Sequence, residues 1–277
     1  MKRIRQFHPD RGIEGMRKRH LPFGPILAAA VIALSALPST LIAMDGAELA
    51  RRVYDREDGD DAYAHVRMLL IDKSGHKRMR TMISARKDYG ELSKSLIRFT
   101  SPESIKGTGF LTWENEEGDD DQFLYLPALR RVRRIVSRQK DGQFVNTDYT
   151  YEDMQRRKPE RDEHKILGTE TVEGYDCRVL ESVPKDPKST QYSKVVNWVI
   201  KDMYLPVKTE YYEKRGRLEK VFMAREIKEI QGIQSVLESE LRSFRRKHRT
   251  LMKTEDIKYN TGIPDRVFTR RYLENPD

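Results

Sequence analysis

Alternation of apolar and polar residues at a period of two is the feature that most limits what this chain can fold into. It runs through most of the sequence after residue 61 and is broken by turn residues. This period places successive side chains on opposite faces of a β-strand. The pattern predicts about eleven strands, at residues 62–72, 77–85, 92–100, 107–114, from 122 onward, 175–183, 194–201, 206–214, 217–230, 234–246 and 250–259.

Short turns between these strands predict an antiparallel meander. About eleven strands are too many for a flat open sheet, so we expect the sheet to curl into a half-barrel. Residues 149–158 and 264–273 look helical or irregular, and we expect them to cover the concave side. Before the first strand, Asp45 can cap a short helix that ends at the acidic run 55–61. One face of this helix holds Leu49, Ala50, Val53 and Tyr54. The predicted fold class is mainly β, of the α+β type.

The composition is consistent with a sheet that buries one face and exposes the other to solvent, because apolar residues (37%) and charged residues (35%) are almost equally frequent. Residues 44–277 contain no linker or repeat, so we predict a single domain there. The net charge of the whole sequence is +9, but residues 1–43 contribute seven Lys/Arg and two Asp/Glu. The remaining residues contain 46 Lys/Arg and 42 Asp/Glu, which gives a net charge of +4. A charge this small argues against nucleic-acid binding. Cys177 is the only cysteine, so an intrachain disulfide is impossible.

The first 43 residues predict export. A long basic stretch precedes a short apolar run, 26–37, and small residues follow, with Ala43 as the expected last residue before cleavage. The run is too short to span a bilayer, so we predict a Sec-type signal peptide at 1–43 and a periplasmic protein. Met16 is an alternative start, and an uncleaved anchor is the alternative to cleavage.

Motifs for catalysis or metal binding are missing from the sequence. The histidines are scattered without paired metal-ligand spacing, and neither a Gly-x-Ser-x-Gly elbow nor a phosphate-binding loop occurs. Cys177 lies in the middle of a predicted strand, where a small core residue is expected. We therefore predict a protein that is not an enzyme and that has no metal and no cofactor.

One stretch of the chain resembles a known family. Gly107-Thr108-Gly109-Phe110-Leu111-Thr112-Trp113 is followed by Leu124-Tyr125-Leu126-Pro127-Ala128-Leu129, then by Arg130, Arg131, Arg133 and Arg134 and by Tyr149, Tyr151, Glu152 and Asp153. This pattern resembles the outer-membrane lipoprotein-sorting family of LolA-like periplasmic proteins. The resemblance implies a curled antiparallel sheet with helices over its concave side and an apolar cavity for acyl chains. It also implies a partnership with an inner-membrane exporter of the RND/MMPL type.

Aromatic residues at sheet positions are the candidates for lining such a cavity, although they could equally fill a closed core. They are Phe110, Trp113, Phe123, Tyr125, Phe144, Trp198, Tyr211 and Phe222. The basic run Arg130, Arg131, Arg133 and Arg134 is the candidate surface for lipid head groups, transient membrane contact or an acidic partner. In a strand, Arg131 and Arg133 share one face, while Arg130 and Arg134 share the other.

Two functional hypotheses follow. The first is a carrier or chaperone that binds lipid or lipoprotein acyl chains and helps their transfer to the outer membrane. The second is a structural or adaptor protein of an envelope complex, with a filled β core. The nature of the cargo, lipoprotein or free lipid, stays open at this stage.

Overall fold

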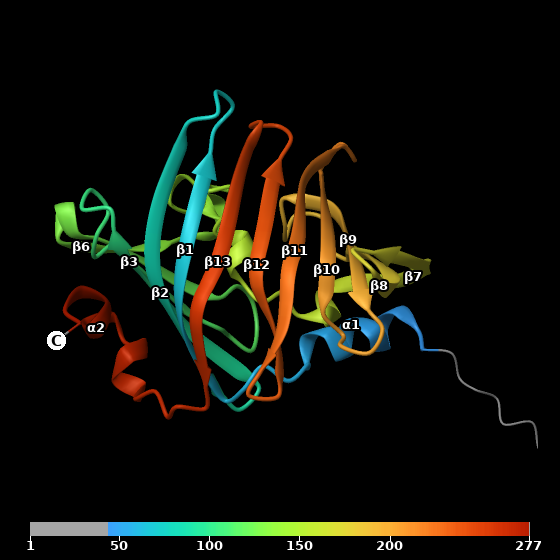
Figure 1. The fold of residues 1–277 in the computed structure, drawn as a ribbon, viewed down its shortest axis with the longest axis horizontal. Helices are drawn as coiled ribbons and strands as arrows, with labels where there is room; N and C mark the ends of the chain where they lie inside the picture. The colour runs from blue at the N-terminus through green and yellow to red at the C-terminus, as the bar shows by residue number, and fades with distance from the viewer. Residues whose placement is uncertain (1–43, 277) are drawn as a thin grey trace, which may run out of the picture. The chain divides into compact units, whose positions relative to one another are not determined.

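The computed structural model describes residues 44–276, and the predicted signal peptide lies outside these residues. A single antiparallel sheet of 13 strands dominates the described part (Figure 1). Its strands lie in the order β6-β5-β4-β3-β2-β1-β13-β12-β11-β10-β9-β8-β7, so the sheet is open, with β6 and β7 at its two edges. Of the helices found in residues 44–276, none has the length and apolar character needed to cross a membrane.

The first six strands form one arm of the sheet and the last seven form the other. The first arm consists of β1 (Asp61–Ile71), β2 (Lys77–Tyr89), β3 (Leu92–Ser101), β4 (Gly109–Trp113), β5 (Asp121–Leu126) and β6 (Arg131–Ile135). The second arm consists of β7 (Asp162–Val172), β8 (Tyr175–Pro184), β9 (Tyr192–Ile200), β10 (Pro206–Glu213), β11 (Leu218–Ile230), β12 (Ile233–Ser243) and β13 (His248–Tyr259). The arms join where β1 pairs with β13.

The prediction of a curled antiparallel sheet is confirmed, but the count of about eleven strands is wrong. The two missed strands are β6 and β7, the edge strands. Their sequences, RVRRI and DEHKILGTETV, are dominated by polar side chains that are largely exposed. An edge strand has less apolar surface to bury, so its alternation is weak even though its backbone pairs normally.

The chain crosses the concave side of the sheet between β6 and β7. Part of this crossing, which we call the plug, comprises η3 (Phe144–Asn146), the following residues and η4 (Glu152–Met154). Phe144 and Tyr151 of the plug pack against Phe99 and Phe110 of the sheet, with ring centroids 5.0–6.1 Å apart. The concave side of the first arm is therefore filled by the chain itself.

The opposite, convex face of the first arm is covered by the C-terminal segment, which we call the outer cover (residues 263–274). It contains η6 (Asp265–Phe268) and α2 (Arg270–Glu274), and its Phe268 and Leu273 pack on Leu111 and Phe123. Leu111 is adjacent to Phe110 in β4, so the two side chains lie on opposite faces. The expectation that residues 264–273 cover the concave side is therefore wrong, because they pack on the other face.

Asp61 holds the outer cover in place. Its carboxylate accepts hydrogen bonds from Thr261 N and Oγ1 at 2.9 Å, Gly262 N at 2.7 Å and Ile263 N at 3.1 Å. Although burial acts to raise the pKa of Asp61, these donors outweigh it and the pKa is lowered. The end of the chain is thus tied to the start of β1.

Candidate functional site

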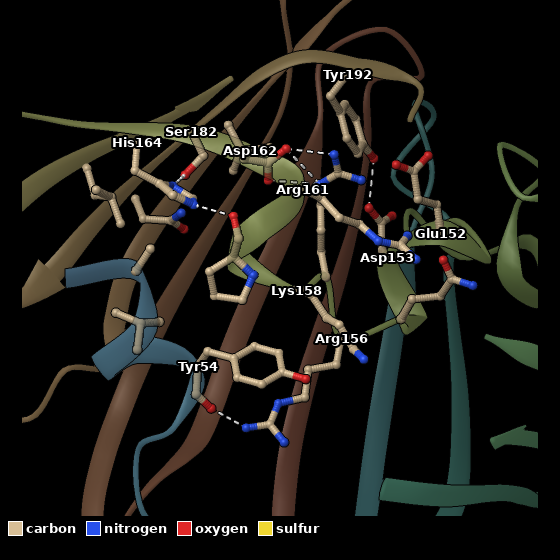
Figure 2. A pocket seen from close by; sticks show the side chains of 18 of the residues that line it. Tyr54, Glu152, Asp153, Arg156, Lys158, Arg161, Asp162, His164, Ser182 and Tyr192 are labelled. Carbon is tan, nitrogen blue, oxygen red and sulfur yellow. Dashed lines mark hydrogen bonds and ion pairs between the residues drawn. The ribbon is translucent and has the colours of Figure 1, made fainter. Parts of the chain in front are cut away.

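A pocket of ≈ 500 Å³ lies on the concave side of the second arm, between the sheet and the segment that leads into β7 (Figure 2). Its apolar wall comes from helix α1 (Gly46–Tyr54) and from β8 and β9, through Ala50, Val53, Leu180 and Val195. Its polar wall comes mainly from residues 152–162. We call it the first pocket.

Helix α1 forms as the sequence predicts and positions one wall of this pocket. Asp45 caps it by accepting a hydrogen bond from Glu48 N at 2.8 Å. Leu49 and Ala50 are buried in a cluster with Leu180 of β8. Gly46 allows the close approach, because a Cβ at this position would lie 2.5 Å from the carbonyl oxygen of His164 in β7.

A buried ion pair stands at the inner end of the first pocket. Asp153 of the plug and Lys220 of β11 are in contact, and their side chains are 4% and 3% exposed. Asp153 also accepts hydrogen bonds from Thr150 N and from Tyr192 Oη, the latter at 2.7 Å. Burial, followed by the negative charge of Asp153, raises the pKa of Tyr192 well above its usual value. Tyr192 is therefore a neutral donor that ties the plug to β9.

Two further contacts hold residues 157–164 in place. Arg157 donates to the Asp162 carboxylate through Nε and Nη2, with distances of 2.6 to 3.0 Å. His164 Nδ1 lies 2.9 Å from Ser182 Oγ, and its Nε2 lies 2.8 Å from the carbonyl oxygen of Pro159. A carbonyl can only accept, so Nε2 donates to the carbonyl oxygen of Pro159, while Nδ1 shares a hydrogen bond with the Ser182 hydroxyl. Both ring nitrogens are thus engaged.

The mouth of the first pocket brings opposite charges together. Tyr54 donates to Glu114 Oε1 at 2.5 Å, and the Arg156 guanidinium lies 4.1 Å from the centre of the Tyr54 ring. Asp120 lines the same region. Burial raises the pKa of the Asp120 carboxyl to about 6, and the neighbouring charge of Glu114 acts in the same direction. Asp120 is thus a pocket carboxyl expected to change charge near pH 6.

Chemically, the first pocket is suited to holding an amphiphile. It combines apolar side chains on one wall with charged and hydrogen-bonding groups on the other. Cys177 is a free, fully buried thiol in another cluster, as the sequence predicts, and burial raises its pKa. Within residues 44–276, no group of His, Cys, Asp and Glu has the arrangement of a metal site.

The structure distributes the eight predicted aromatic residues over four places. Phe110 lies under the plug and Phe144 belongs to the plug itself, while Trp113, Phe123 and Tyr125 lie on the convex face with the outer cover. Trp198 and Phe222 belong to a core cluster of the second arm. Only Tyr211 of the eight lines the first pocket. The alternation showed that these side chains leave the solvent, but it could not show to which face each one turns.

All four predicted arginines are exposed and stand at the β6 edge of the sheet. Arg133 pairs with Leu124, whose side chain faces the plug, and Arg134 pairs with Phe123, whose side chain faces the outer cover. Arg131 shares the face of Arg133, as predicted, whereas Arg130 is a left-handed turn residue with φ of 45°. Arg134 forms an ion pair with Asp121.

Sequence reasoning missed the residues that form most of the first pocket. Residues 149–158 were predicted only as a helical or irregular cover, residues 159–162 were not assigned, and no ligand role was given to the charged residues of either stretch. The available signal was a run of long charged side chains, Arg156-Arg157-Lys158, next to a segment predicted to lie over the sheet. Such side chains fill a concave space poorly and leave room for another molecule.

These features define a class: an open, strongly curled antiparallel sheet whose concave side holds a plug and a pocket. Solved structures share the fold. A DUF1329 family protein from Desulfovibrio piger is 32% identical, with a TM-score of 0.79 over 82% of this chain and 97% of its own. A domain from Vibrio parahaemolyticus described as outer membrane lipoprotein-sorting is also 32% identical, with a TM-score of 0.78 over 83% and 98%. The LolA superfamily protein NE2245 from Nitrosomonas europaea shares the fold at 20% identity, with a TM-score of 0.66 over 83% and 100%.

A family model described as "uncharacterized protein"-like matches residues 91–275, which is most of the described chain. Comparison with curated proteins found no match. The chain therefore belongs to the DUF1329 family and to the same family as the Vibrio parahaemolyticus domain described as outer membrane lipoprotein-sorting.

Proposed function

We propose that this protein is a non-enzymatic periplasmic carrier that binds an acyl chain of a lipid or lipoprotein on the concave side of its sheet. In this proposal residues 1–43 direct export and residues 44–277 form one lipid-binding domain. Family membership supports the role, since a relative of 32% identity is described as lipoprotein-sorting. The observation that carries the proposal is the first pocket, which leaves apolar surface of α1, β8 and β9 uncovered by the chain itself.

The size and lining of the first pocket suit one acyl chain better than a bulky cargo. Its volume of ≈ 500 Å³ lies in the range of small-molecule sites, roughly 300–1,000 Å³. At about 25 cal/mol per Å² of apolar area removed from water, an acyl chain held there gains several kcal/mol. Val53, Leu180, Val195 and Tyr211 supply this contact.

The aromatic residues predicted to line the cavity have different roles in this proposal. Tyr211 contacts the ligand directly. Phe110 and Phe144 become ligand surface only when the plug leaves the concave face, because they now pack on each other. Trp113 and Phe123 hold the outer cover, since the Trp113 indole donates to Phe268 O at 2.9 Å. We propose no ligand contact for Trp113 and Phe123, nor for Tyr125 beside them.

The exposed arginines at the β6 edge supply the proposed surface for lipid head groups or for an acidic partner such as an RND/MMPL-type exporter. Leu129, 68% exposed at the tip of the β5–β6 turn, stands beside them. An apolar tip surrounded by cations suits transient contact with an anionic membrane surface. The double variant Arg131→Glu, Arg133→Glu tests this role through adsorption to anionic vesicles at low salt.

A charged side chain placed in the first pocket tests acyl binding. Val195 is partly exposed inside the pocket, so Val195→Asp should remove bound lipid while the protein stays folded. Val183→Asp is the matched control, because Val183 is 39% exposed on β8 and does not line the pocket. Native mass spectrometry of both proteins, purified from periplasm without detergent, gives the lipid content. Equal lipid in the two variants would show that the ligand does not occupy this pocket.

The filled concave face of the first arm favours a second candidate, an adaptor of an envelope complex with a packed core. Phe144 is 1% exposed and Phe110 is 2% exposed, so this arm leaves no room for a ligand with the plug in place. An adaptor would be purified without lipid and would still capture a membrane complex. A wild-type protein that carries no lipid, yet binds such a complex through the β6 edge, would support this alternative.

A further inference from the structure

Three neighbouring hairpin turns, β1–β2, β12–β13 and β10–β11, stand at the same end of the sheet (Figure 1). Ile71 pairs with Lys77 of β2 and with Arg249 of β13, so the first two turns are adjacent, and β11 connects the second turn to the third. At the usual strand spacing, neighbouring turns are roughly 10 Å apart. We call them together the tip row, which comprises residues 73–79, 214–218 and 244–249.

The tip row is strongly basic. It contains ten Lys/Arg and no Asp/Glu. The acids that flank it in the sequence are Asp72, Glu213 and Glu219. Arg246 alone among the ten is not fully exposed, and it donates to Thr147 O at 2.5 Å and to Asp148 Oδ1 at 3.1 Å in the plug. The other nine cations face the solvent.

Most of the exposed cations of the tip row have no acidic partner. Arg217, Arg245 and Arg249 form ion pairs with glutamates. The six that form no ion pair with another residue of the described range 44–276 are Lys73, Lys77, Arg78, Lys214, Arg215 and Lys247. Their positive charge is therefore available to another molecule.

The acids of the domain gather at the other end of the sheet. Residues 55–60 and 114–120 contain nine Asp/Glu and one Lys/Arg, and both stretches line a common hollow. Strand β1 leads from one end to the other, and its 11 residues span roughly 35 Å. This is several times the Debye length of about 8 Å at physiological ionic strength, so the acids do not cancel the field of the tip row. The small net charge of the domain therefore hides two oppositely charged ends.

Each turn of the tip row also exposes one large apolar side chain. Met79 is 51% exposed, Leu218 36% and Phe244 41%, and the Arg242 guanidinium lies 5.3 Å from the centre of the Phe244 ring. A protein interface has an apolar core depleted of charged residues, whereas these three side chains stand on separate hairpins among cations. Single apolar tips among cations fit the head-group layer of a membrane, because apolar groups enter it while cations stay at its surface.

We propose that the tip row docks on an anionic membrane surface, with its lysines and arginines against the lipid head groups and Phe244 inserted between them. This contact adds to the one proposed for the arginines at the β6 edge, since β3, β4 and β5 lie between β2 and β6. It is independent of acyl binding, because no residue of the tip row lines the first pocket. The acidic end, with Glu114 and Asp120 at the pocket mouth, then faces away from the membrane.

Co-sedimentation with vesicles tests the docking, using the protein purified from periplasm. One vesicle is phosphatidylcholine alone, and the other is an equal mixture of phosphatidylcholine and phosphatidylglycerol. We expect adsorption to the anionic vesicle at low salt, little to phosphatidylcholine, and release at about 1 M salt, where the Debye length is about 3 Å. Lys77→Glu with Lys247→Glu should weaken adsorption roughly 25-fold or more, since each Lys or Arg near an anionic surface contributes roughly fivefold. Phe244→Ser should weaken it severalfold through lost apolar contact.

Two further double variants serve as controls. Lys228→Glu with Lys258→Glu makes the same change of net charge at two exposed cations outside the tip row, and it should adsorb within about twofold of wild type. Lys77→Arg with Lys247→Arg keeps the charge and should adsorb as wild type does. An equal loss in the Lys228 and Lys258 variant would reduce the effect to net charge and overturn docking by the tip row.

Other outcomes separate this inference from the proposed function. A loss confined to Arg131→Glu, Arg133→Glu would assign membrane contact to the β6 edge and overturn docking by the tip row. A wild type that adsorbs to neither vesicle would overturn it as well and leave the tip row to an acidic protein, and equal adsorption to both vesicles would overturn it because charge would not matter. Val195→Asp should adsorb as wild type does, so failure of acyl binding leaves the docking intact.

Discussion

The two arms of the sheet fill their concave faces differently. In the first arm the plug brings Phe144 and Tyr151 into contact with the sheet, and the outer cover buries the other face as well. In the second arm the same crossing segment presents Arg156, Arg157 and Lys158, and a pocket remains. One chain segment thus closes one arm and leaves the other open.

The difference follows from the side chains rather than from the backbone. Aromatic rings are rigid and fill a concave space to the density of a protein interior. Long charged side chains keep their ends hydrated and pair with carboxylates, as Arg157 does with Asp162, so they do not pack into the remaining space. Stability should therefore concentrate in the first arm, and ligand binding in the second.

Removing an aromatic ring from the plug should have the largest effect. Phe144→Ala takes away a side chain that touches three other rings, and we expect the free energy of unfolding to fall by about 3–5 kcal/mol. Val195→Ala in the pocket, where space is already present, should lower it by less than about 1 kcal/mol. Urea unfolding measures both. Similar losses would mean that the two arms are packed alike.

The buried pair Asp153–Lys220 should be the main stabilising contact of the pocket side. Lys220→Met leaves Asp153 buried without its cation, and we expect the free energy of unfolding to fall by about 3 kcal/mol. Adding Asp153→Asn to this variant should restore much of the lost free energy of unfolding, because the uncompensated charge disappears. A double-mutant cycle by urea unfolding gives the coupling. If the single variant keeps wild-type stability, the pair does not hold the plug.

Loss of the Asp61 contacts should free the outer cover. Asp61→Asn replaces an acceptor of four hydrogen bonds, and we expect the free energy of unfolding at pH 7 to fall by about 2 kcal/mol. Because the pKa of Asp61 is lowered on folding, its contribution is present above its unfolded pKa, about 4, and is lost as the pH falls further. Hydrogen exchange of residues 263–274 reports the release. Unchanged protection at pH 7 in the variant would contradict this role.

Asp120 should show a smaller effect of opposite sign. Its pKa is raised on folding to about 6, so the folded state binds the extra proton and stability falls as the pH rises from about 4 to 6. We expect Asp120→Asn to be more stable than wild type at pH 7, by on the order of 1 kcal/mol, and equal to it at pH 4. Unfolding midpoints across this range check the difference. A difference in unfolding midpoint that stays constant across this pH range would mean that Asp120 does not titrate within it.

Much of the fold could be predicted from the sequence because strand alternation is a local property. It located the inner strands of both arms, the capped helix at Asp45 and the buried Cys177. It failed at β6 and β7, because edge strands are largely exposed and do not need an apolar face. The motif between Gly107 and Asp153 identified the family, because those residues are adjacent in the chain.

The candidate site depended on contacts between residues far apart in the chain. Alternation assigned Phe110 and Phe123 to the sheet interior alike, yet the pairing of β4 with β5 puts them on opposite faces, and the outer cover, more than 140 residues later, buries Phe123. Asp153 came within hydrogen-bond distance of Tyr192 in β9 only when the crossing segment folded over the sheet. By itself the sequence determined which side chains leave water, since that depends on each strand. Which of them meet, and where space remains, depends on how segments pack, and only the tertiary structure decided it.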